Sequence, residues 1–236
     1  MQERKQGRRS AEAAEQTKCD ILHAAADMFA EQGFERVSLR NISEKAGVSH
    51  SLIRHHFGSK EQIWQAVSDG MDDFMQRYIT AIINYLPESY TSAQRVYHFL
   101  SYMSAFTLVH PRPIQFIADA VRQDDDALLR YFLRSKDEFS AAFSSLFDEY
   151  NRDNPEKPVD MWEMKWQMLQ TVHAATSLRP MMAETWPDCG DDQDKLLLKH
   201  WSLYNRIIAM QLAIPADEMI RVESLHSLIF DVPCHV

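Results

Sequence analysis

The chain has 236 residues, of which 45% are hydrophobic and 25% charged, with only six glycines. Such a chain is long enough to bury a sizeable core, and scarce glycine without sustained Val/Ile/Thr alternation favours an all-α fold over a sheet. The net charge of −9 excludes a uniformly basic protein, yet residues 1–60 carry 10 Lys and Arg against 8 Asp and Glu, so this part could approach phosphate.

The N-terminal segment predicts a basic arm followed by an amphipathic helix. Residues 1–13 contain the basic run MQERKQGRRS, and residues 14–32 have helical apolar periodicity. The apolar stripe consists of Ile21, Leu22, Ala25, Met28 and Phe29. Gly33 supplies a left-handed cap, so we expect this helix to end there.

Two short helices follow. Ser38 is a good N-cap for a helix that buries Leu39, Ile42 and Ala46 and stops at Gly47. Ser49 then caps a third helix that ends at Gly58, with Val48 placed to pack on Ile53. The spacing predicts two short helices joined by the turn at residues 47–49.

A long fourth helix begins after Ser59, which forms a capping-box pattern with Gln62, and ends before Pro87. Its apolar seam runs from Ile63 to Ile82. We therefore expect a small three-helix domain at residues 14–60 and a larger helical domain at residues 61–236. Further helical segments of this second domain are predicted at 92–109, 114–121, 127–150, 161–178 and 195–214, with a last amphipathic piece after Pro215.

Other features restrict the class of protein. Cys19, Cys189 and Cys234 are scattered without a C-x-x-C pair, so neither a disulfide framework nor a zinc knuckle is indicated. No apolar run approaches the ~18–20 residues that span a bilayer. We expect a cytoplasmic protein that has no membrane partner, metal or cofactor.

The third helix has two faces of different chemistry. Ile53 and Phe57 share an inward face, and the opposite face is formed by His50, Ser51, Arg54 and His55. A short polar helix presented after a tight turn by another short helix is typical of a helix-turn-helix, whose second helix enters the major groove of DNA.

The polar residues suit this interpretation. Arg54 can donate two hydrogen bonds to guanine O6 and N7, the commonest specific contact, while His50 and Ser51 lie on the first helical turn. Ser38 and Lys60 lie at helix N-termini, where backbone N–H groups attract phosphate, and Arg40 follows Ser38 closely.

The segment ILHAAADMFAEQGFERVSLRNISEKAGVSHSLIRHHFGSKEQIW resembles the DNA-binding domain of the TetR family of bacterial regulators. The resemblance rests on A-x-x-x-F-A-x-x-G-[FY], I-x-x-x-A-G-V-S and H-F-x-S-K-E-x-[IL] at fixed spacing, over residues 14–68. It implies a homodimer on a palindrome of double-stranded DNA and a ligand cavity in the larger domain. With Ser38 and the capping Ser49, the residues in DNA-contacting positions are Arg40, His50, Ser51, Leu52, Arg54, His55, His56 and Lys60.

The third helix also has simpler interpretations than DNA binding. A short helix with a polar face is often only a solvated surface element. Most members of the family carry tyrosine at the position of Arg54, so the role of this arginine differs from theirs. His55 and His56 lie about 100° apart on a helix, whereas helical metal ligands occupy positions i and i+4, which disfavours metal binding.

Methionine and aromatic residues are frequent in the second domain. They are core residues on the plain interpretation, and the family resemblance implies an effector cavity among them. The candidate effector-binding residues are Phe106, His110, Phe116, Phe139, Phe143, Trp162, Trp166 and His173.

The segments 161–178 and 195–214 have apolar residues on more than one side of the predicted helix. In the first, Trp162 and Trp166 mark one stripe and Met164 and Met168 another. A surface helix needs only one such stripe, so we expect the second to meet another subunit of a homodimer.

These observations lead to a functional hypothesis: a repressor released from a palindromic operator by a small-molecule effector, and not an enzyme. One alternative is a DNA-binding regulator without an effector, controlled by a protein partner or by abundance. A helical enzyme is the other, but H-E-x-x-H, G-x-S-x-G, P-loop and G-x-G-x-x-G motifs are absent from the sequence.

Overall fold

The computed structural model describes residues 3–123, 126–134 and 136–233, and the side chains from residue 13 onward except at 136, 138, 139 and 142. Every regular element in these ranges is helical, as the sequence predicts. The described chain forms two compact units. The head unit contains the chain up to Phe74, residues 115–134 and Pro233, and the body unit contains residues 75–114 and 136–232.

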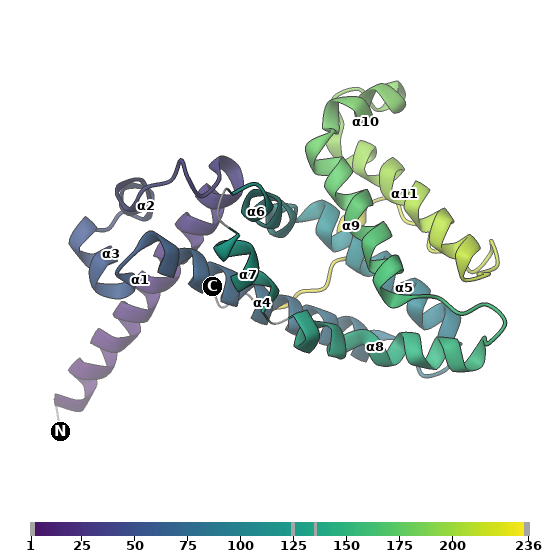
Figure 1. Ribbon diagram of the computed structural model, residues 1–236, viewed down its shortest axis with the longest axis horizontal. Helices are drawn as coiled ribbons and strands as arrows, with labels where there is room; N and C mark the ends of the chain where they lie inside the picture. The colour runs from purple at the N-terminus through teal and green to yellow at the C-terminus, as the bar shows by residue number, and fades with distance from the viewer. Residues whose placement is uncertain (1–2, 124–125, 135, 234–236) are drawn as a thin grey trace. The chain divides into compact units, whose positions relative to one another are not determined.

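The head unit is built on α1 (Glu3–Gln32), α2 (Leu39–Ala46) and α3 (His50–Phe57), which Figure 1 shows in purple and blue. To these it adds the first part of α4 (Lys60–Tyr85), most of α6 (Arg112–Val121) and α7 (Ala127–Leu133). The compact unit is therefore larger than the segment 14–60, because two helices distant in sequence complete it. The helices α4 and α6 both continue along the chain from one unit into the other.

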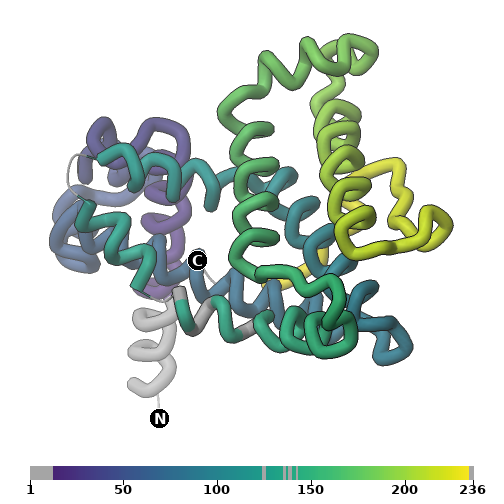
Figure 2. Tube along the Cα trace, turned by 45° about the vertical axis from the view of Figure 1, so that its right-hand side comes forward, coloured from purple at the N-terminus to yellow at the C-terminus, as the bar shows by residue number. Residues whose placement is uncertain are grey.

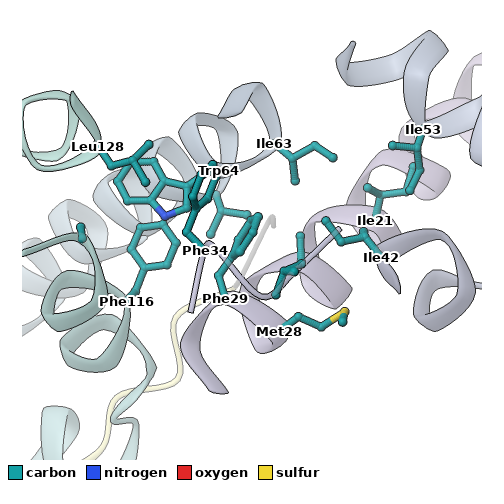
Figure 3. Packing of buried hydrophobic residues seen from close by; sticks show 14 residues of the cluster. Ile21, Met28, Phe29, Phe34, Ile42, Ile53, Ile63, Trp64, Phe116 and Leu128 are labelled. Carbon is teal, nitrogen blue, oxygen red and sulfur yellow. The ribbon is translucent and has the colours of Figure 1, made fainter. Parts of the chain in front are cut away.

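The core of the head unit joins all of these helices. Figure 3 shows Ile21 of α1, Ile42 of α2 and Ile53 of α3 close together, and each is fully buried. Further along the same cluster lie residues of α4, α6 and α7, namely Ile63, Trp64, Val67, Phe116, Ala120 and Leu128.

The indole of Trp64 and the ring of Phe116 stack with their centroids 4.5 Å apart and an angle of 13° between their planes. Both side chains are only 1% exposed. Phe116 is among the candidate effector-binding residues expected in the larger domain, but its ring lies in the core of the head unit. The periodicity of the segment showed that Phe116 is buried without showing which core it enters.

The body unit contains α5 (Ser92–Val109), α8 (Lys136–Asp153), α9 (Met161–Ser177), α10 (Arg179–Thr185) and α11 (Gln193–Gln211). Figure 2 shows α9 and α11 running alongside each other, in green and yellow-green. The helix α5 packs against α8, α9 and α11. Its buried residues, including Leu108, share a core with Val172 of α9 and Trp201 of α11.

Four details differ from the predicted elements. The helix α1 begins at Glu3, within the segment predicted as a basic arm, rather than near residue 14. The predicted helix at 127–150 is divided into α7 and α8, because Leu128 packs in the head unit whereas Phe143 and Phe147 pack in the body unit. The helix α10 was not predicted. After α11 the described chain is irregular apart from two short turns, including the 3-10 turn Leu225–Leu228.

This irregular C-terminal segment is tied to the body unit by side-chain hydrogen bonds. The hydroxyl of Tyr97 accepts the Ile220 N–H at 2.9 Å, and the Asn205 amide donates to the Ile220 carbonyl at 3.1 Å. The Tyr78 hydroxyl accepts the Phe230 N–H at 3.2 Å, and burial raises the pKa of Tyr78 to about 12. This hydroxyl therefore stays neutral at ordinary pH.

Within the described residues, no helix combines the length and the apolar character needed to cross a membrane.

The Trp64–Phe116 stack predicts the effect of truncating Phe116. Phe116→Ala should lower the free energy of unfolding by about 3–5 kcal/mol, because it opens a cavity in the head core. The urea-unfolding transition of the full chain measures this change. Leu133→Ala, at a residue of α7 that is 45% exposed, is the control and should change the free energy by no more than about 0.5 kcal/mol. Equal effects of the two substitutions would contradict the assignment.

Candidate nucleic-acid interface

The short helix α2 is held at both ends by local contacts. At its start, the Asn41 N–H donates to Ser38 Oγ at 3.2 Å, and the Ser38 N–H donates to Asn41 Oδ1 at 3.0 Å. At its end, Gly47 adopts φ 68°, a left-handed conformation that costs glycine little. The chain turns here, and α3 begins at His50. The predicted helix–turn–helix connection is confirmed.

The helix α3 is capped in the same way. The Leu52 N–H donates to Ser49 Oγ at 3.2 Å, and Gly58 ends the helix with φ 74°. The predicted capping box at the start of α4 is present, since Ser59 and Gln62 exchange backbone-to-side-chain hydrogen bonds of 3.2 Å. Caps at both ends keep a helix of eight residues in place.

The two faces of α3 separate by burial. Ile53 is completely buried in the head core, whereas His50, Ser51, Arg54 and His55 are exposed. Leu52 and His56 are half-buried at the margin. The exposed face carries hydroxyl, imidazole and guanidinium groups, and the helix sequence HSLIRHHF contains no carboxylate. This face can donate hydrogen bonds and attract anions.

The predicted phosphate contacts have different surroundings. Arg40 is exposed, with its Nε 2.9 Å from Glu44 Oε1 one turn along α2, and this hydrogen bond raises the pKa of Arg40. An exposed ion pair of this kind is screened by solvent, so the guanidinium can exchange partners. Lys60 is half-buried instead. Its ammonium donates to the Phe34 carbonyl at 2.9 Å and lies 4.0 Å from the centroid of the Phe34 ring.

Among the described candidate effector-binding residues, Phe106 and His110 lie together, and the others are spread over both units. Phe106 and Phe143 are buried in the body unit, where Phe106 packs on Tyr78 at 4.1 Å and Phe143 stacks on Phe99 at 5.4 Å between centroids. His110 lies at the end of α5 with its ring 4.9 Å from that of Phe106.

The other candidates lie elsewhere. Trp162, Trp166 and His173 are exposed on α9, while Phe116 is in the head core. The side chain of Phe139 lies outside the described residues. In the ranges that the structure describes, no three His, Cys, Asp or Glu side chains are grouped so that they could hold a metal ion.

Known proteins resemble this chain most clearly in the region that contains the helix-turn-helix. Residues 21–67 fit the family of bacterial regulatory proteins described as the tetR family. The HTH-type transcriptional repressor Rv3405c of Mycobacterium tuberculosis is 38% identical over 65 residues, which are 28% of this chain and 35% of that protein. The HTH-type transcriptional repressor KstR2 of Mycolicibacterium smegmatis is 38% identical over 60 residues, which are 25% of this chain and 29% of that protein.

These curated relatives are therefore matched over about a third of their length or less. A solved structure extends the likeness of fold to most of the chain. The transcriptional regulator FadR from Bacillus subtilis, in complex with stearoyl-CoA, superposes with a TM-score of 0.59 at 16% identity and covers 83% of this chain and 97% of that one. Because the identity is low, this structure shows the fold alone. The N-terminal region thus matches the tetR family of bacterial regulatory proteins, and the described chain shares an all-helical fold with the FadR structure.

Proposed function

We propose that the protein is a sequence-specific DNA-binding transcriptional regulator that inserts α3 into the major groove. The observation that carries this proposal is the exposed face of α3, where four polar side chains lie opposite the fully buried Ile53. A rigid, capped helix presented by α2 and a tight turn has the geometry of a recognition helix.

The exposed side chains would have different roles. Arg54 can hold guanine O6 and N7 with two parallel N–H donors, which gives base preference. His50 and Ser51 lie on the first turn of α3, from which they can reach base edges or phosphate oxygens. His55 and the exposed Arg40 are placed for backbone contacts that position the protein without reading sequence. Lys60 is a weaker candidate than Arg40, because its ammonium already contacts the Phe34 carbonyl and ring.

A homodimer would use α9 and α11. Large apolar side chains are exposed on both helices, with Trp162 and Trp166 on α9 and Leu203, Ile207 and Met210 on α11; Met210 is 82% exposed. The methionine stripe of α9, including Met164 and Met168, is buried in the body unit. The second apolar stripe is thus left for a partner, and a second copy of the chain would provide two recognition helices for a palindrome.

The sign of regulation is proposed to be repression, with release by a small-molecule effector bound in the body unit. Two relatives matched over the N-terminal region are called transcriptional repressors. The FadR structure that shares the fold holds stearoyl-CoA, so acyl-CoA thioesters belong in a ligand screen. A regulator without an effector is the second candidate, and it is favoured by the scattered positions of the candidate effector residues.

The role of Arg54 can be tested by two substitutions. Arg54→Ala should abolish the preference for one base pair of the operator, at a cost of about 1–3 kcal/mol. Arg54→Lys keeps the charge but not the planar pair of donors, so it should lose the same preference and retain more affinity for unrelated DNA. Competition binding against operators mutated one base pair at a time measures both quantities.

As a matched control, Arg40→Ala should weaken binding to all sequences alike and reduce the salt slope by about one. A uniform loss of affinity in both Arg54 variants would contradict base recognition by this residue.

The dimer surface can be tested separately. Ile207 is 43% exposed, so Ile207→Asp should be tolerated in a single chain. In a dimer it would bury an unpaired carboxylate at a cost of several kcal/mol, so we expect a monomer in sedimentation at micromolar concentration. Tyr85→Asp, at a 63% exposed residue of α4, is the control and should remain dimeric. A monomeric wild-type protein would exclude the dimer.

A further inference from the structure

The turn between α1 and α2 is held from two sides by residues that the sequence does not connect. Phe34 lies at this turn and is buried, with 7% of its surface exposed. Its backbone N–H and carbonyl groups both bond to side chains of other helices. One partner is Asp119 of α6, and the other is Lys60 at the start of α4.

The first contact replaces part of an ordinary helix cap. At the end of α1, the Gly33 N–H donates to the Phe29 carbonyl at 3.0 Å, and Gly33 has φ 81°. In a complete Schellman cap, the next N–H would bond back to a carbonyl of the same helix. The Phe34 N–H instead donates to Asp119 Oδ2 at 2.7 Å. A carboxylate acceptor makes this a charge-assisted hydrogen bond, which is stronger than one between neutral groups.

Asp119 approaches the turn so closely that a side chain at residue 33 would push its carboxylate away. A Cβ atom at Gly33 would lie 2.4 Å from Asp119 Oδ1, which is a severe overlap. Gln123, two residues after the end of α6, donates to Asp119 Oδ2 at 3.0 Å and holds the carboxylate in place. The contact therefore depends on a glycine, an aspartate and a supporting glutamine.

The second contact leads towards the recognition helix. The Phe34 carbonyl accepts the Lys60 ammonium at 2.9 Å and the Val37 N–H at 3.3 Å. Val37 directly precedes Ser38, the N-cap of α2. Lys60 is the first residue of α4, two residues after Gly58, which ends α3. The peptide groups at Phe34 thus join α6 to the segments on both sides of the helix-turn-helix.

We propose that Asp119 is a positioning residue for DNA recognition: through Phe34 and Lys60 it fixes the orientation of α2 and α3. This proposal rests on the proposed function of α3. In this role, Asp119 does not itself touch DNA. Loss of its carboxylate should make α2 and α3 less well ordered and should reduce sequence-specific binding, while electrostatic binding to unrelated DNA is retained.

The test compares full-length variants in two measurements. In DNA-free protein, Asp119→Ala should increase hydrogen exchange of the α2 and α3 amides about tenfold. It should also weaken operator binding about tenfold and leave affinity for unrelated duplex DNA unchanged. Asp119→Asn keeps an acceptor oxygen without the charge and should restore part of both properties. Asp126→Ala removes an exposed carboxylate that precedes α7 and pairs with Arg130 of that helix, and it should behave like the wild type.

The outcomes separate this inference from the proposed function. Unchanged exchange in Asp119→Ala overturns the positioning role, and so does an equal loss of specific and unspecific binding with a lower thermal midpoint. If Asp119→Ala does not fold, Gln123→Ala tests the same contact and should give a smaller effect in the same direction; no effect on exchange or specificity overturns the role. If the wild-type protein selects no operator, the proposed function fails, and the exchange measurement still decides whether Asp119 orders α2 and α3.

Discussion

The burial of Ile53 is the interaction on which the candidate interface depends. A helix of eight residues is marginal in water on its own, since isolated helices need about 12–15 residues. Full burial of one isoleucine side chain contributes roughly 1.5–3 kcal/mol, and the Ser49 cap adds about 1 kcal/mol. Packing on Ile21 and Ile42 therefore holds α3 in place from one side only. The exposed side chains of His50, Ser51, Arg54 and His55 are left for contacts outside the protein.

The same core explains why the head unit is larger than its helix-turn-helix. The cluster that contains Trp64 includes residues of α6 and α7 besides those of α1 to α3. The ring of Phe116 stacks on Trp64, and Leu128 belongs to the same group of buried residues. Because α6 and α7 contribute to this core, a change in α6 can alter the head unit through packing and through the Asp119–Phe34 hydrogen bond.

Local signals in the sequence predicted the local structure well. Glycines at 33, 47 and 58 have positive φ, and serines at 38, 49 and 59 accept the expected capping hydrogen bonds. Such features depend on residues three or four apart, so they can be read directly from the chain. The division between Ile53 and the exposed polar face follows equally from helical periodicity.

Contacts between distant segments could not be predicted in this way. Phe116 has the pattern of a buried helical residue, but periodicity does not tell which core receives it. From its place at a helix N-terminus, Lys60 is predicted to be a free cation. No residue close to it in the sequence indicates its contact with Phe34, 26 residues earlier. No sequence pattern marks Asp119 as a residue of the candidate site. Periodicity marks two apolar stripes on α9 but does not show that the stripe with Trp162 and Trp166 is the exposed one.

Whether the exposed face of α3 reads DNA sequence can be measured by sequencing the DNA that the purified protein retains from sheared genomic fragments. We expect recovery of an inverted repeat whose half-sites are centred about 10–10.5 base pairs apart, or a multiple of that distance. Recovery of fragments without a shared sequence, at both low and moderate salt, would contradict this expectation.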